Sequence, residues 1–149
     1  MKRLGAAIAA LAVGSLIYLL WRPRTLTVFT WLDVVGGERV VGSIRFHASW
    51  FFQYLPGWVL YSLPSALWIF SGLLLFDLIW GGKSSAGKKF WSLLLWFIAL
   101  GGEFGQSLQI VPGSFDPQDI YLMLISGGLA HLSLLYLASP VERGKNDIL

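Results

Sequence analysis

The stretch Phe90 to Val111, FWSLLLWFIALGGEFGQSLQIV, decides the fold, because it is a long apolar run that ends in polar chemistry. A run of roughly 20 apolar residues is long enough to cross the hydrocarbon core of a bilayer as a helix. The end of this run, EFGQSLQ, carries one carboxylate and two amides at Glu103, Gln106 and Gln109. An ionisable side chain at membrane depth is costly, so Glu103 marks a functional site by default.

Composition places the rest of the chain in the same class. Of its 149 residues, 56% are hydrophobic and 13% are charged, whereas a soluble domain carries about 25% charged residues. The apolar runs are too long and too uninterrupted for an outer-membrane barrel. We therefore expect an all-α, polytopic membrane protein with one domain, residues 1–149. The chain has no cysteine, which excludes disulfides and thiolate metal sites.

Three further apolar runs have a similar length. Together with the run at 90–111 they predict a bundle of four transmembrane helices, at about residues 4–20, 62–80, 90–111 and 119–138. The run at residues 4–20 has the basic start of a signal peptide, but no small-residue cleavage site follows it, so we interpret it as a retained helix. Residues 140–149 form a cytoplasmic tail in this interpretation.

The basic residues set the expected orientation. Four spans put both termini on one side together with the loop 81–89, and that side collects seven Lys and Arg against four on the other. Cytoplasmic segments are enriched in Lys and Arg, so both termini are predicted to be cytoplasmic in a multi-pass protein of the bacterial inner membrane. Because the basic residues lie beside apolar runs, the net charge of +3 predicts no nucleic-acid partner.

The segment 25–61, between the first two spans, is too long for a simple connection. Its first part fits either a hairpin, with residues 26–35 turning at Gly36 and Gly37, or a short amphipathic helix from Gly37 through Arg45. Its second part, WFFQYLPGW at residues 50–58, is dense in aromatic side chains and broken by Pro-Gly. Aromatic residues favour the headgroup region, so we expect this external segment to rest on the outer leaflet.

Four polar side chains are expected to gather at the outer end of the bundle: Glu103, Gln106, Asp116 and Asp119. They fit a pocket that opens outward and binds an envelope component or a lipid headgroup, with Glu103 as acceptor or proton carrier. They also fit a cluster of hydrogen bonds that holds helices together. A third reading has the three carboxylates converge on a hard cation such as Mg²⁺ or Ca²⁺. We predict the first, with no metal and no cofactor.

Three acidic and basic positions have separate explanations. Asp116 with Pro117 after it is typical of a helix start, in which the Asp side chain caps the first turn. His131 is predicted to be a buried hydrogen-bonding residue, with a water-linked polar relay to Glu103 as the alternative. Asp77 lies near the cytoplasmic end of its span, where it is expected to pair with a cation or reach the interface.

A resemblance to a known family rests mainly on residues 91–138. The chain resembles the VanZ-like membrane proteins, small multi-span bacterial proteins, in these positions: Glu103, Gln106, Phe115, Asp116, Asp119, Gly127 and Gly128. The start of the second span, Leu63 to Trp68, is a weaker match. The chain departs from the family pattern at Gly113, where an Arg is usual, and at Met123, where an Asn is usual.

The resemblance implies a role in the cell envelope and a link to resistance against glycopeptide antibiotics of the teicoplanin type, and we expect this role to be non-enzymatic. Two alternatives come from other classes of function. One is an intramembrane hydrolase or transferase that uses the carboxylates with a metal. The other is a structural subunit of a larger membrane complex.

Overall fold

All regular elements of the protein are helices in the computed structural model, which describes residues 1–24 and 27–137. The prediction of an all-α fold is therefore confirmed. In chain order the elements are α1 (Lys2–Trp21), α2 (Thr27–Val34), α3 (Glu38–Ala48), the 3₁₀ helix η1 (Ser49–Tyr54), α4 (Gly57–Tyr61), α5 (Leu63–Ile79), α6 (Ala86–Ser107) and α7 (Pro117–Leu137).

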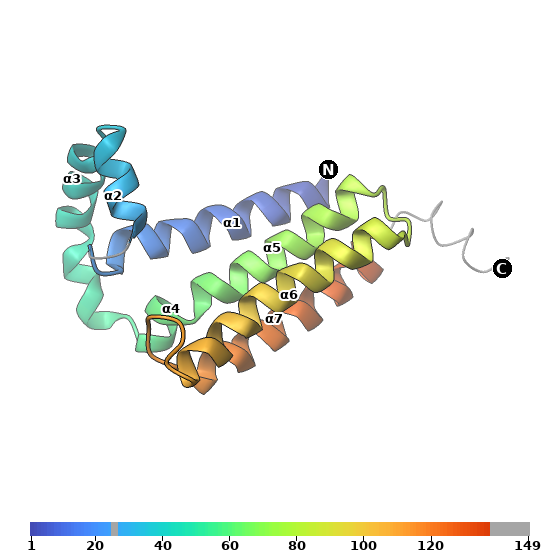
Figure 1. The fold of residues 1–149 in the computed structure, drawn as a ribbon. Coiled ribbons are helices and arrows are strands. Elements are labelled where there is room, and N and C mark those ends of the chain that lie inside the picture. The colour runs from blue at the N-terminus through green and yellow to red at the C-terminus, as the bar shows by residue number, and fades with distance from the viewer. Residues whose placement is uncertain (25–26, 138–149) are drawn as a thin grey trace, which may run out of the picture.

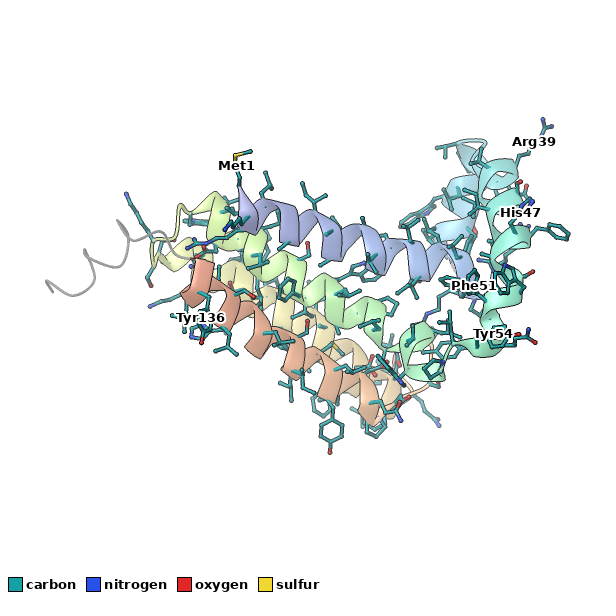
Figure 2. All side chains as sticks on the ribbon, turned by 180° about the vertical axis from the view of Figure 1, so that it is seen from behind. Met1, Arg39, His47, Phe51, Tyr54 and Tyr136 are labelled. Carbon is teal, nitrogen blue, oxygen red and sulfur yellow. The ribbon has the colours of Figure 1, made fainter. Side chains whose placement is uncertain are left out.

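The four long helices, α1, α5, α6 and α7, lie side by side as an elongated bundle (Figure 1). Helix α5 is central, since it packs against α1, α6 and α7. Met1 and Tyr136 lie at one end, here called the terminal end (Figure 2). Helices α2 and α3 stand across the opposite end, here called the platform end, to which the loop between α6 and α7 also belongs (Figure 1).

The long helices coincide with the four predicted apolar runs, and the largest differences concern α6. This helix begins at Ala86 because Ser85 caps it, accepting a hydrogen bond from the backbone N of Lys88 at 3.1 Å. It ends at Ser107 because the chain then folds back, with the backbone N of Ile110 donating to the carbonyl of Gly105 at 2.9 Å. The predicted end at Val111 is therefore wrong by about one helical turn.

Two helices are both long and apolar enough to cross a membrane, Lys2–Trp21 and Pro117–Tyr136, with mean hydropathies of 2.1 and 1.3. Helix α5 is apolar but has 17 residues. Helix α6 has 22 residues, yet Lys88, Lys89 and Glu103 fall within it. By length and composition alone these two helices could cross a membrane, and crossing by all four long helices is a prediction.

Of the two alternatives for the first part of the segment 25–61, the hairpin is excluded, because Thr27–Val34 is helical. The chain reverses at Gly36, whose φ of 71° suits glycine, and the backbone N of Gly37 donates to the carbonyl of Leu32 at 2.8 Å. The amphipathic helix expected from Gly37 through Arg45 is present as α3. We call α2, α3 and η1 the platform. Its aromatic side chains Phe51 and Tyr54 are exposed.

Small residues let the bundle helices approach closely. A Cβ added at Gly14 would lie 3.0 Å from Trp68 Nε1, and one at Gly72 would lie 2.7 Å from Leu95 Cδ2. Two serine hydroxyls also join helices, because Ser71 Oγ donates to the Ala7 carbonyl at 2.8 Å and Ser126 Oγ donates to the Ala66 carbonyl. Close backbones and such hydrogen bonds are the usual means of helix association in a lipid environment.

An ionic clamp joins all four long helices at the terminal end. Asp77 on α5 is 3% exposed, and its Oδ2 lies 2.8 Å from Arg3 Nη1 on α1. Its Oδ1 lies 2.5 Å from Lys88 Nζ on α6. Arg3 Nη2 also donates to the Leu134 carbonyl on α7 at 3.5 Å. The expected pairing of Asp77 is therefore present, with partners from two other helices.

Candidate functional site

Two carboxyl groups meet inside the bundle at the platform end. Glu103 lies near the end of α6 and Asp119 lies in the first turn of α7, so the reversal of the chain between them brings the two side chains together. Each residue is 8% exposed. Asp119 is the charged residue that acts most strongly on the Glu103 carboxyl, and Asp116 also acts on it. We call Glu103 and Asp119 the carboxyl pair.

The carboxyl pair has unused acceptors. Glu103 Oε2 and Asp119 Oδ1 are buried and have no hydrogen-bond partner among the residues that the structure describes. The charged groups that act on Glu103 are Asp119 and Asp116, which are both acids. In contrast to the ionic clamp, therefore, no Lys or Arg in residues 1–24 or 27–137 forms an ion pair with Glu103 or Asp119.

The chemistry of two carboxyl groups in contact follows from their charge. Two buried carboxylates repel each other, and burial removes the water that would screen them. The arrangement is stable when a proton or another cation lies between the two groups. The carboxyl pair is therefore a place where a positive charge is favoured.

Asp116 plays the capping role that the sequence predicts. Its Oδ1 accepts a hydrogen bond from the backbone N of Gln118 at 2.9 Å, and Pro117 occupies the first helical position of α7. The side chain is half-buried. Capping accounts for one of its oxygens and fixes the start of α7, which in turn sets the position of Asp119 two residues after Pro117.

Replacing Asp116 with asparagine should keep most of the capping bond, whereas replacing it with alanine should lower the free energy of unfolding by ~0.5–2 kcal/mol. Asparagine retains a side-chain oxygen that can accept from Gln118, and alanine does not. Thermal unfolding of the two variants in mild detergent measures the difference. Equal stability of both variants and the wild type would show that the cap contributes nothing.

The other two predicted site residues, Gln106 and His131, differ in their burial. Gln106 is half-buried and lies against the loop, since a Cβ added at Gly113 would be 2.7 Å from its Cδ. His131 is exposed, so the prediction that it is buried is wrong. The buried face of α7 passes through Asp119, Met123, Ser126 and Ala130. His131 follows Ala130 and is turned about 100° away from that face.

A buried serine lies at the same end of the bundle as the carboxyl pair. Ser62, at the start of α5, is 0% exposed, and its Oγ has no partner among the described residues. A Ser before Leu-Pro is typical of a helix start. Ser62 occupies the N-cap position of α5, yet its side chain makes no capping hydrogen bond. Only its burial distinguishes it, and burial is not visible in the sequence.

Within residues 1–24 and 27–137, no group of three or more His, Cys, Asp and Glu side chains is arranged to hold a metal ion. Comparison with known proteins adds no family: no family model, no curated protein and no solved structure matches the chain.

Proposed function

We propose that the chain is an integral membrane protein in which α1, α5, α6 and α7 all cross the bilayer. The exposed flanks of these helices support the proposal, because large apolar side chains cover them. Ile8 is 55% exposed, Phe97 is 75% exposed and Leu124 is 52% exposed. A soluble protein rarely exposes apolar surface that extends along several whole helices. In a bilayer these side chains would contact lipid acyl chains, which are apolar, and not water.

The charges at the two ends support an orientation. Lys2, Arg3, Lys83, Lys88 and Lys89 belong to the terminal end, which would face the cytoplasm by the usual distribution of basic residues. The platform would then lie on the outer leaflet. Its exposed aromatic residues, among them Trp31, Trp50 and Tyr54, are of the types enriched at membrane interfaces.

Topology reporters should separate this orientation from the alternatives. A reporter fused after Leu149 or inserted at Gly82 is expected to behave as cytoplasmic, and one inserted at Gly36 or Gly113 as external. Alkaline phosphatase and green fluorescent protein fusions make the comparison in living cells. An external C-terminus would reverse the orientation, and opposite locations for Gly36 and Gly113 would remove one of the four spans.

The carboxyl pair is the site at which we propose that the protein acts. Its outer position, its burial and its two unpartnered oxygens suit a ligand that brings a positive charge of its own. An ammonium group meets this need, since it donates several hydrogen bonds and carries one charge. The protein would thus bind an envelope component or a lipid headgroup through an ammonium group. The observation that carries this proposal is the contact between Glu103 and Asp119 without a basic partner.

This role fits the resemblance to the VanZ-like proteins, whose implied link to glycopeptide resistance stays a prediction. The metal-dependent hydrolase or transferase is the second candidate, since the same two carboxylates could ligate a cation. Within residues 1–24 and 27–137, no group of three or more His, Cys, Asp and Glu side chains is arranged to hold a metal ion, so water would have to complete the coordination. We therefore prefer binding over catalysis.

Native mass spectrometry of the detergent-purified full chain tests the proposal with decylammonium as probe. Wild-type protein is expected to retain decylammonium, and to retain decanol, which has the same chain without the charge, at least about tenfold more weakly. Glu103→Gln and Asp119→Asn should each abolish this preference, because each removes one charge while keeping the shape of the side chain.

Asp33→Asn is the matched control, since Asp33 is an exposed acid on α2. It should bind decylammonium as the wild type does. Full retention of decylammonium by a stably folded Glu103→Gln variant would refute the site and leave the pair as an interhelical contact.

A further inference from the structure

A hollow opens where the platform meets the end of α1. Its volume is about 460 Å³, and it lies between the last turn of α1, helix α3 and η1. Three aromatic side chains line it, Trp21, Phe46 and Phe52, together with Arg45. The hollow is thus apolar apart from one guanidinium group and the hydroxyl of Ser49. It is separate from the carboxyl pair, which α6 and α7 supply.

Arg45 is held in place with donors to spare. Its Nη1 donates to the Leu19 carbonyl at 2.6 Å, its Nη2 donates to the Arg22 carbonyl at 2.9 Å, and its guanidinium lies 5.1 Å from the centre of the Phe29 ring. A guanidinium has more N–H groups than these two bonds use. The side chain is therefore oriented by α1 and α2 and still able to bind an anion.

A second cation lies beside the hollow. A Cβ added at Gly42, which lines the hollow, would be 3.0 Å from Arg24 Nη2. Burial, and then repulsion by Arg24, lower the pKa of Arg45. Arg24 also pairs with Glu38 at 3.2 Å, but both side chains are more than half exposed, and such surface pairs contribute little stability, so Arg24 can exchange this partner for another anion. Positive charge is therefore concentrated at one side of the hollow.

We propose that this hollow binds the phosphate group of an anionic phospholipid from the outer leaflet. Arg45 and Arg24 would bind the phosphate oxygens, because a guanidinium matches phosphate geometry. The glycerol and the upper acyl chains would contact Trp21, Phe46 and Phe52, side chains of the kind that favour the headgroup level. The inference rests on the proposed membrane orientation, which brings lipid headgroups to the platform.

The alternative is that Arg45 only stabilises the end of α1 and that the hollow binds no ligand. The side chain binds carbonyls at the end of α1, and cations stabilise helix C-termini. Two substitutions separate the roles, since neither touches these bonds. Arg24→Gln removes the second charge, and Gly42→Leu fills the hollow from the middle of α3. Arg39→Gln is the matched control, because Arg39 projects from the far end of the platform (Figure 2).

The experiment is a titration of the detergent-purified full chain with dioctanoyl phosphatidylglycerol, followed by native mass spectrometry. Dioctanoylglycerol, which lacks the phosphate, and inorganic phosphate alone are the comparison probes. We expect the phospholipid to bind at least about tenfold more tightly than either. Arg24→Gln and Gly42→Leu should each weaken it about tenfold, while Arg39→Gln leaves it unchanged.

Three results would overturn the inference. Equal binding of dioctanoylglycerol would make the hollow a purely apolar site, and equal binding of inorganic phosphate would make the ligand a free anion. Unchanged binding in both Arg24→Gln and Gly42→Leu would place the lipid elsewhere. Glu103→Gln should leave phospholipid binding intact, so failure of the carboxyl pair proposal and failure of this one are distinguishable.

Discussion

Replacing Asp77 with alanine is expected to lower the free energy of unfolding by ~3–5 kcal/mol, because it removes one partner from a buried ionic group. Asp77 is 3% exposed and contacts Arg3 and Lys88 with separate oxygens. Without the carboxylate, two cations remain close together at the terminal end, and Lys88 is largely buried there. Since these residues belong to α1, α5 and α6, the change should loosen three helices together.

Unfolding of the purified protein in mild detergent, by heat and by added sodium dodecyl sulfate, measures this loss. Asp33→Ala is the matched control, because it removes an exposed aspartate from the platform and should change stability little. Replacing the three clamp residues together with apolar side chains of similar size should restore much of the lost stability. An Asp77→Ala variant as stable as Asp33→Ala would mean that water already screens the clamp.

Replacing Gly127 with alanine is expected to cost about 1–3 kcal/mol by overpacking. A Cβ at this position would collide with the indole of Trp96, which packs across from α6. Because the obstacle is a large, rigid ring and not the end of a flexible chain, α6 and α7 must move apart to accept the methyl group. That movement would also disturb Glu103 and Asp119, so decylammonium binding should weaken together with stability.

The neighbouring Gly128 supplies the control. A Cβ there would meet nothing within 4 Å, and alanine favours helix over glycine by about 1 kcal/mol. Gly128→Ala should therefore be as stable as the wild type or more stable. The same detergent unfolding assay compares the two variants, and a Gly127→Ala protein as stable as Gly128→Ala would contradict the close packing of α6 on α7.

Local features of the sequence predict much of the fold. The apolar runs give the residue ranges of α1, α5 and α7 to within about two residues, because helix ends follow the change from apolar to polar side chains. The Asp-Pro signal gives the start of α7 and the capping bond of Asp116. Local signals fail where the same residue types occur in both strands and helices. Thr27–Val34, for example, is rich in strand-forming residues and yet helical.

Contacts between distant residues are the part that the sequence does not predict. Glu103, Asp116 and Asp119 are expected to gather, and they do, because a short loop joins their helices. The partners of Asp77 are not foreseen, since Arg3 is 74 residues away in the chain. Nor does the sequence distinguish Gly127 from Gly128, or Ser62 from any other serine at a helix start. Burial and packing decide these roles, and both depend on the whole bundle.

The separation of the ionic clamp from the carboxyl pair has an electrical consequence for a cell with an energised membrane. In the proposed orientation, Arg3 and Lys88 of the clamp lie towards the negative side of the membrane and Glu103 and Asp119 lie towards the positive side, so the transmembrane voltage favours this placement of the two clusters. Carrying one charge across the full voltage is worth ~2.3 kcal/mol per 100 mV. A cation entering the carboxyl pair from outside would cross part of that field, and its occupancy would rise as the membrane is charged.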